Sequence, residues 1–281
     1  MGGGTLYVVA TPLGHLGDLT TRAAELLRSV PTVAAEDTRR TRVLLAHLDA
    51  HPRLISYHAH SAPGAAAGIL ETLRSGQDLA LVTDAGTPGV SDPGAELVAE
   101  VRAAGYAVVP LPGASAVTAA LSAAGLPADR YLFLGFLPRK GGERARLLER
   151  IGREEWTTVL FEAPGRVADL LADLVAACGE ERRAVVAREL TKIHEEFRTG
   201  TLGELAAGLA RDETSLRGEC TVLIEGNPTP PDDDLAARAR PAAARLLAAG
   251  ISRKEVAGML SDLFGVGRNE AYRLTTELGA K

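Results

Sequence analysis

The sequence is poor in aromatic and sulfur-containing residues. Aromatic residues make up 4% of its 281 residues, and it contains two cysteines, Cys178 and Cys220. So few aromatic rings argue against binding of single-stranded nucleic acid by rows of stacked side chains. Two distant cysteines without a Cys-x-x-Cys spacing argue against a disulfide framework and a zinc finger, and they fit a reducing compartment.

Long apolar runs are also missing. No run approaches the roughly 20 residues that a membrane-spanning helix needs. The start, Met-Gly-Gly-Gly-Thr, lacks the basic stretch and apolar run of a secretory signal. We therefore expect a soluble, cytoplasmic protein without a membrane partner. With 46% hydrophobic and 24% charged residues, the composition is that of a globular chain long enough for two ordinary domains.

The formal net charge of −5 does not by itself favour a polyanionic partner. The charge is unevenly distributed, however, because the segment from Leu235 onward contains eight Lys/Arg and four Asp/Glu. An excess of basic residues in one segment can steer nucleic acid toward it. An ordinary solvated helical face has the same composition, so both interpretations stay open.

Short apolar segments alternate with helical patterns over the first 111 residues. Thr20 is placed to cap a helix that ends near Ser29, and Asp92 and Pro93 are placed to cap and begin a later one. Continuously apolar strands between helices are typical of a parallel-rich sheet that is covered on both faces. We expect strands at 6–10, 32–35, 79–83 and 107–111, and the later helix at about 95–104.

The same alternation continues to residue 227. A helix rich in alanine follows Pro112–Ala116, and a more polar segment at 194–198 is expected to form an additional strand. We expect the other strands at 131–135, 157–161, 184–187 and 220–225, and helices near 143–151, 166–177 and 202–210.

The end of the chain is predicted to be helical. Prolines and acidic residues at Asn227–Asp234 are typical of a linker. Ser252 and Glu255 form a capping box, and the glycines at 265 and 267 separate that helix from one at Arg268–Leu278. The sequence thus predicts an N-terminal α/β domain at 1–111, a second α/β domain at 112–227, and a linker with a helix-turn-helix-like domain at 228–281.

Loops rich in glycine, proline, serine and charged residues follow several strands, at 11–18, 83–94, 111–116, 161–166 and 188–192. Ligands of open α/β sheets bind at the carboxyl ends of the strands. Glycine lets a ligand approach the backbone, and the Ser115 hydroxyl and a helix N-terminus can bind a carboxylate or a ribose. A dinucleotide site of the Rossmann type is an alternative interpretation, because Glu36 and Asp37 lie near the position of its acidic residue. The loop at 11–18, however, lacks the Gly-x-Gly-x-x-Gly pattern of such a site.

Six ordered motifs resemble the tetrapyrrole-methylase superfamily, and within it the branch that methylates the 2′-hydroxyl of a cytidine in small-subunit ribosomal RNA. The resemblance covers roughly residues 5–226, and the tail is similar to that branch's small C-terminal helical domain. The motifs are Thr-Pro-Leu-Gly-His-Leu-Gly-Asp at 11–18, Ala-Glu-Asp-Thr-Arg at 35–39, Thr-Asp-Ala-Gly-Thr-Pro-Gly-Val-Ser-Asp-Pro-Gly at 83–94, Pro-Gly-Ala-Ser-Ala at 112–116, Gly-Phe-Leu-Pro-Arg-Lys at 135–140 and Arg-Glu-Leu-Thr-Lys at 188–192.

The resemblance implies two α/β domains of tetrapyrrole-methylase type, with S-adenosyl-L-methionine held folded in the cleft between them, and a small C-terminal helical domain. It also implies a homodimer that acts on small-subunit ribosomal RNA or the assembled small subunit. Two positions depart from the family, since His15 stands where asparagine is usual and Gly165 where histidine is usual. The residues implied to contact the cofactor are Pro12, Leu13, Gly14, Asp84, Ala85, Gly86, Thr87, Pro88, Ser115, Ala116, Phe161, Glu162, Ala163, Leu190 and Cys220.

Methylation of a ribose hydroxyl needs alignment and help for a weak nucleophile. A base or a cation near the hydroxyl would supply that help, and the candidates are Glu36, Asp37, Glu189 and Lys192. A lysine base would need a pKa lowered by burial. Basic residues expected on loops are candidates for binding RNA phosphates, namely Arg39, Arg40, Arg139 and Lys140. Arg144, Arg146, Arg150 and Arg153 extend this basic stretch or form a solvated helix face.

Two alternative functions stay open at this stage, and a third possibility, a metal site, is weak. A methyltransferase acting on a tetrapyrrole-like small molecule would need a wide apolar floor in the cleft. A helix-turn-helix DNA regulator would have only Arg268, Asn269 and Arg273 to read bases, which is too few for firm specificity. His58 and His60, with His51 nearby, suggest a metal, but they lack a third ligand at a suitable spacing, so we predict no metal site.

Overall fold

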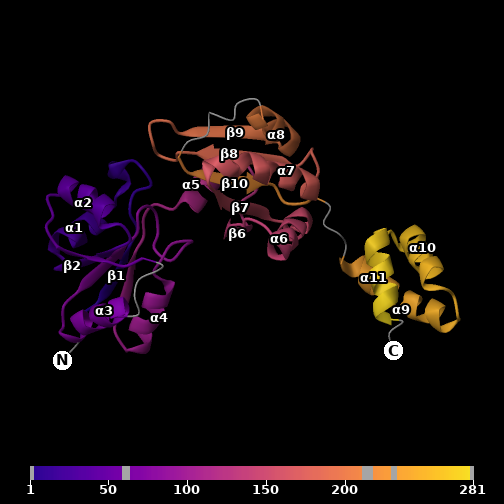
Figure 1. Ribbon diagram of the computed structural model, residues 1–281, viewed down its shortest axis with the longest axis horizontal. Coiled ribbons are helices and arrows are strands. Elements are labelled where there is room, and N and C mark those ends of the chain that lie inside the picture. The colour runs from indigo at the N-terminus through magenta and orange to yellow at the C-terminus, as the bar shows by residue number, and fades with distance from the viewer. Residues whose placement is uncertain (1–2, 59–63, 211–217, 229–232, 279–281) are drawn as a thin grey trace. The chain divides into compact units, whose positions relative to one another are not determined.

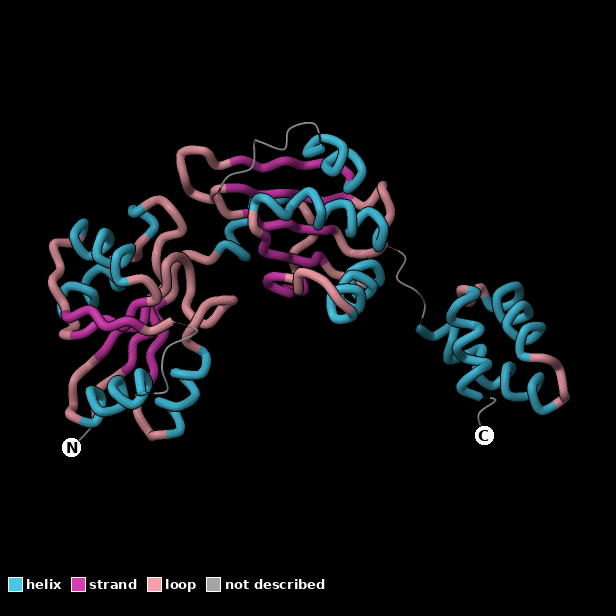
Figure 2. Tube along the Cα trace, viewed as in Figure 1, coloured by secondary structure: helices cyan, strands magenta, loops and turns pink. Residues whose placement is uncertain are grey.

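The computed structural model describes residues 3–58, 64–210, 218–228 and 233–278 (Figure 1). It divides into two compact units, the first made of Met1–Gly152 with Trp156–Gly226 and the second of Arg153–Glu155 with Asn227–Lys281. The first unit contains two five-stranded sheets with helices, and the second is helical (Figure 2). The three domains expected from the sequence stay a prediction.

The first sheet is entirely parallel, as its apolar strands predicted. The sheet and its helices comprise β1 (Leu6–Val9), α1 (Thr21–Ser29), β2 (Thr32–Ala35), α2 (Thr38–His47), β3 (Arg53–Ser56), α3 (Gly64–Arg74), β4 (Leu79–Val82), α4 (Ala95–Ala103) and β5 (Val108–Leu111). The strand order is β3-β2-β4-β1-β5. Alternate residues of β2 face opposite layers: Val33 and Ala35 pack with α1 and α2, and Ala34 packs with α3 and α4. Helices α1 and α2 lie on one side of this sheet and α3 and α4 on the other (Figure 1).

Two expectations about this half need correction. Arg39 and Arg40 lie in the first turn of α2 and not on a loop, because Asp37 caps that helix by accepting from the Arg39 backbone N–H. The expected cap of α4 by Asp92 and Pro93 is wrong. Gly94 is the N-cap residue, with a φ of +135° and no side-chain cap bond.

The second sheet is mixed. The sheet and its helices comprise α5 (Ala116–Ala124), β6 (Tyr131–Phe136), α6 (Gly142–Arg153), β7 (Thr157–Glu162), α7 (Val167–Cys178), β8 (Arg183–Arg188), β9 (Glu196–Thr201), α8 (Leu202–Ala210) and β10 (Cys220–Ile224). The strand order is β6-β7-β10-β8-β9, in which β6 and β7 pair in parallel and the other neighbours pair antiparallel. Helices α6, α7 and α8 cover one face, and α5 covers the other.

Arg144 on α6 is buried and paired, which excludes it from the basic surface considered above. Its Nε and Nη2 donate to Asp173 Oδ2 at 2.9 and 2.6 Å, and its Nη1 donates to the Pro138 carbonyl at 3.0 Å. The guanidinium therefore ties α6 to α7 and to the loop after β6.

Replacing Arg144 with methionine is expected to lower the free energy of unfolding by about 1–3 kcal/mol, because it leaves both acceptors without their donor. Urea denaturation of the purified variant measures this change. Arg146→Met, an exposed position on the same helix, is the matched control and should shift stability by less than about 0.5 kcal/mol. Equal effects at the two positions would contradict the assigned role of Arg144.

The second unit is built from α9 (Asp233–Ala248), α10 (Arg253–Phe264) and α11 (Arg268–Leu278). The predicted capping box is confirmed, with Ser252 and Glu255 bonded reciprocally, and Gly265 ends α10 in the left-handed conformation. Buried side chains from all three helices form one core. Across the described parts of the chain, no helix combines the length and the apolar character needed to cross a bilayer.

Candidate functional site

A cavity of about 460 Å³ lies in the first unit, lined by residues at the ends of strands from both sheets. Its volume is within the roughly 300–1,000 Å³ of ordinary small-molecule sites. The lining comes from the segments that follow β1, β2, β4 and β5, from the last residue of β6, from the end of β7 with the residues after it, and from the segment that begins β10. Four of the five loops that the sequence singled out thus contribute to one cavity, and the loop at 188–192 does not line it.

Most of the residues expected to contact a cofactor line this cavity: Leu13, Asp84, Ala85, Gly86, Thr87, Ser115, Ala116, Phe161, Glu162, Ala163 and Cys220. Pro12, Gly14, Pro88 and Leu190 are not among the lining residues. Leu190 is buried in the core beneath α5. Gly14 lies against the Lys192 side chain, which a Cβ at this position would overlap.

Several lining residues were not predicted: Val90, Ser91, Asp92, Phe136, Pro164, Gly218, Glu219 and Thr221. Val90, Ser91 and Asp92 belong to the loop at 83–94, and Phe136 belongs to one of the six motifs, so a signal for these was present. Gly218 and Glu219 follow no recognisable pattern, and only the tertiary structure brings them to the cavity.

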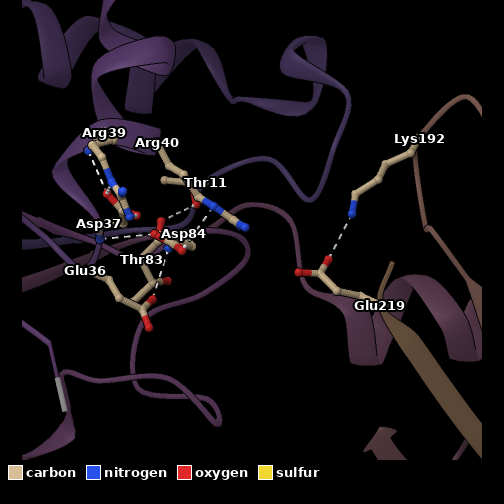
Figure 3. A network of polar contacts seen from close by, with 9 residues as sticks. All are labelled: Thr11, Glu36, Asp37, Arg39, Arg40, Thr83, Asp84, Lys192 and Glu219. Atoms are coloured by element: carbon tan, nitrogen blue, oxygen red, sulfur yellow. Dashed lines mark hydrogen bonds and ion pairs between the residues drawn. The ribbon is translucent and has the colours of Figure 1, made fainter. Parts of the chain in front are cut away.

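Asp84 organises the side of the cavity formed by the first sheet (Figure 3). Its Oδ1 accepts from the Asp37 backbone N–H at 3.1 Å, and its Oδ2 lies 3.4 Å from Arg40 Nε. Its own backbone N–H donates to Glu36 Oε2 at 3.2 Å. The ends of β2 and β4 are therefore held together by the residues that line the cavity.

Asp37 and Arg39 form a pair at the start of α2. Arg39 Nη2 lies 2.7 Å from Asp37 Oδ2, and the side-chain hydrogen bonds of Arg39 hold the pKa of Asp37 at about 2. Such a carboxylate stays ionised and is a poor proton acceptor. Arg39 is 85% exposed despite this pairing, so its guanidinium remains accessible to a further anion.

The lining is strongly acidic. Arg40 is the one basic side chain among the described residues that line the cavity, against five carboxylates: Glu36, Asp84, Asp92, Glu162 and Glu219. Glu162 is buried, with Oε1 accepting from the Ala163 N–H at 2.8 Å and Oε2 lying 3.3 Å from Arg166 Nη2. Arg40, Arg166 and Lys192 lie within 4 Å of three of these carboxylates, and the negative charge that remains, on Glu36 and Asp92, favours a cationic ligand in a partly enclosed site.

Burial raises the pKa of Asp92 from 3.8 to about 6, and the nearby Glu36 carboxylate adds to this increase. The folded protein therefore binds a proton that the unfolded chain has already lost between these two pH values. Stability falls as the pH rises through this window and stays lower above it. We expect Asp92→Asn to raise the melting temperature at pH 8, because it removes the charge that is costly to bury.

The gain from Asp92→Asn should disappear at pH 3.5, where the carboxyl of the parent protein is largely protonated in both states. Thermal melting of parent and variant across this pH range is the measurement. A shift of the same size at both ends would show that the titration of Asp92 is not its cause.

Lys192 lies on a strained loop after β8, in which Glu189 and Thr191 have φ values of +51° and +64°. Its Nζ donates to Glu189 Oε1 at 2.8 Å and to Glu219 Oε2 at 3.1 Å, the second contact being drawn in Figure 3. Burial alone would lower the pKa of Lys192, but the hydrogen bonds to the two carboxylates outweigh it and raise this pKa. Lys192 is therefore a fixed ammonium group and not a base.

Neither Cys220 nor the histidines provide a metal centre among the described residues. Burial raises the pKa of the Cys220 thiol to about 11, so it is neutral. No group of three His, Cys, Asp or Glu side chains suited to a metal occurs in the described ranges. His51 lies 3.3 Å from Asp49, and His60 falls outside the described residues.

The comparisons with known proteins agree with this arrangement. The family model of tetrapyrrole (corrin/porphyrin) methylases matches residues 5–206. A protein of Synechocystis sp. named ribosomal RNA small subunit methyltransferase I is 44% identical over 99% of this chain and 99% of its own. A protein of the same name from Escherichia coli O157:H7 is also 44% identical, over 98% of this chain and 95% of its own.

Solved structures share the fold. A cobalt precorrin-4 methyltransferase matches with a TM-score of 0.61 and 19% identity, over 79% of this chain and 94% of its own. A uroporphyrin-III C-methyltransferase from Thermus thermophilus, complexed with S-adenyl homocysteine, matches with a TM-score of 0.58 and 21% identity, over 79% of this chain and 97% of its own.

The resemblance inferred from the six motifs is confirmed by the family match and by relatives that align over nearly their whole length. The chain belongs to the tetrapyrrole methylase family and, within it, to the group of ribosomal RNA small subunit methyltransferase I.

Proposed function

We propose that this protein transfers a methyl group from S-adenosyl-L-methionine to the ribose 2′-hydroxyl of a cytidine in small-subunit ribosomal RNA. The observation that carries the proposal is the acidic cavity on which the family's loops converge. The names of its relatives supply the acceptor class. The solved structures are less than 25% identical, so they support the fold and do not favour a tetrapyrrole acceptor.

The cavity fits the proposed cofactor. Leu13, Ala116 and Phe161 offer apolar surface for its adenosine, and the Ser115 hydroxyl makes no cap bond with α5, so it is available to a ligand. The acidic lining suits the positive charges on the sulfonium and the amino group. When bound, S-adenosyl-L-methionine supplies an electrophilic methyl group.

Among the candidate bases, Glu36 is the one that lines the cavity. The pKa of Asp37 is held low by Arg39, and the pKa of Glu189 is lowered because contacts led by the Lys192 hydrogen bond outweigh the effect of its burial. We therefore assign Glu36 to accept the proton of the ribose hydroxyl. Lys192 is not among the lining residues, but its Nζ donates to the lining residue Glu219 at 3.1 Å, and we assign it to stabilise negative charge on the ribose oxygen.

Exposed basic residues are assigned to the RNA backbone. Arg39, Arg139 and Lys140 are exposed, and phosphate contacts of this kind position a nucleic acid without reading its sequence. Arg40 is also a candidate, although it is already close to Asp84.

The proposal includes a homodimer that works in the cytoplasm on small-subunit RNA or on the assembled subunit. Light scattering of the purified protein tests the dimer, which should have twice the chain mass of 29.3 kDa.

Titration calorimetry with S-adenosyl-L-methionine tests the cofactor. We expect saturable binding with one cofactor per chain, and the absence of binding would refute the proposed function. Labelled cofactor offered with small-subunit particles or with a porphyrin separates the two acceptor classes, and labelled porphyrin would favour the alternative.

A further inference from the structure

Strand β6 contains a bulge close to the cavity. Its register against β7 passes from Phe133 opposite Val159 to Gly135 opposite Leu160, which leaves Leu134 without a partner. One extra residue reverses the alternation of side chains beyond that point. Phe136 is therefore placed on the face that carries Phe133, and not on the face of Leu134.

The packing of the phenylalanines shows this change of face. Leu134 packs with the core beneath α6, α7 and α8, whereas Phe133 and Phe161 pack on the α5 side. The Phe136 ring centroid lies 5.6 Å from that of Phe161, which in turn lies 4.9 Å from that of Phe133. The bulge has thus added Phe136 to an aromatic row that runs to the cavity.

The Phe136 side chain is more exposed here than it would be in the core. It lines the cavity and yet is 57% exposed, in a chain with only five phenylalanines. Without the bulge, its side chain would point toward the α6–α8 core.

The bulge is held by a tight contact with the loop after β4. Gly135 has a φ of +62°, and a Cβ at this position would lie 2.6 Å from Ser91 Oγ. Ser91 itself has a φ of +60°, which is unusual for a residue other than glycine. Gly135 and Ser91, both in the left-handed backbone conformation, therefore fix the position of the Phe136 ring at the cavity.

We propose that the exposed face of Phe136 stacks on the base of the acceptor nucleotide, and this inference rests on the proposed function. A ribose hydroxyl can reach an enclosed methyl donor only if its nucleotide leaves the surrounding RNA structure. Unpaired bases of this kind are stabilised by stacking on aromatic side chains. A ring that is more than half exposed lies at the rim of the cavity, where an incoming polymer would meet it, and the less exposed Phe161 would contact the bound cofactor.

The experiment compares Phe136→Ala and Phe136→Trp with Tyr131→Ala, a matched control. Tyr131 is 41% exposed at the other end of β6 and does not line the cavity. Methylation of small-subunit particles gives kcat and KM, and calorimetry gives the affinity for S-adenosyl-L-methionine. For Phe136→Ala we expect kcat/KM for the particles to fall about tenfold at unchanged cofactor affinity. Phe136→Trp should keep the activity that Phe136→Ala loses, and Tyr131→Ala should have the same kinetics as the parent.

Three results would overturn the inference. Phe136→Ala could methylate as well as the parent, it could lose cofactor affinity, which would place the ring against the cofactor, or Phe136→Trp could fail to restore activity. A parent protein that binds the cofactor and methylates no RNA would refute the proposed function itself, and with it this inference.

Discussion

Lys192→Ala and Arg39→Ala are expected to lose RNA methylation while they keep their affinity for S-adenosyl-L-methionine. Removing a preorganised charge from a reacting oxygen commonly costs about 10²–10³ in rate, so we expect kcat of Lys192→Ala to fall about a hundredfold. Arg39 is exposed beside the cavity, and its loss should raise KM for the RNA. Methylation kinetics and calorimetry on the same preparations separate the two effects.

Controls keep this test specific. Arg102→Ala removes an exposed arginine on α4, outside the lining of the cavity, and should leave the kinetics unchanged. Lys192→Arg keeps the positive charge and should retain part of the activity. If Lys192→Ala and Arg39→Ala both methylate normally, the roles assigned to these residues are wrong.

Gly86→Val is expected to weaken binding of S-adenosyl-L-methionine more than about a hundredfold. Gly86 has a φ of +81°, and its N–H and C=O are bonded to the Thr11 backbone at 3.0 and 2.9 Å, so it has little freedom to move. A valine would be strained there by about 1–3 kcal/mol. Its Cβ would lie 3.4 Å from Leu13 Cδ2, beside a wall of the cavity.

Gly105→Val provides the matched control for this strain. Gly105 has a φ of +83°, follows α4, and has open space where a Cβ would stand. Both variants should lose thermal stability, and only Gly86→Val should lose cofactor affinity in calorimetry. Parent-like affinity of Gly86→Val would exclude this cavity as the cofactor site.

Local patterns predicted most of the fold. The bounds of β2 and α11 agree with their sequence prediction, because an apolar run and a glycine break mark their ends. The prediction omitted α2, β3 and α3, and its linker ended at Asp234, one residue past the start of α9. The first turn of α2 is Thr38-Arg39-Arg40, whose charges resemble those of a functional loop, and β3 is a short edge strand that begins with Arg53. The sequence also could not predict which strands of the second sheet run parallel, because buried parallel and antiparallel strands can be equally apolar.

For the site too, features of single loops could be predicted from the sequence, whereas contacts between residues far apart in the chain could not. Loops with unusual glycine and proline content pointed to the cavity correctly. The pairing of Lys192 with Glu219 could not be predicted, because these residues lie 27 positions apart and meet only through the pairing of β8 with β10. The role of Phe136 likewise depends on the bulge in β6. Gly135 inside the strand is a sequence signal for a bulge, but only the pairing with β7 shows toward which face Phe136 is turned.

The most direct test of the account is mass spectrometry of nucleosides from small-subunit RNA after incubation with the protein and S-adenosyl-L-methionine. We predict that 2′-O-methylcytidine increases with the parent protein and does not increase with Gly86→Val. A methyl group on a base, or no methylated nucleoside at all, would contradict the proposed reaction.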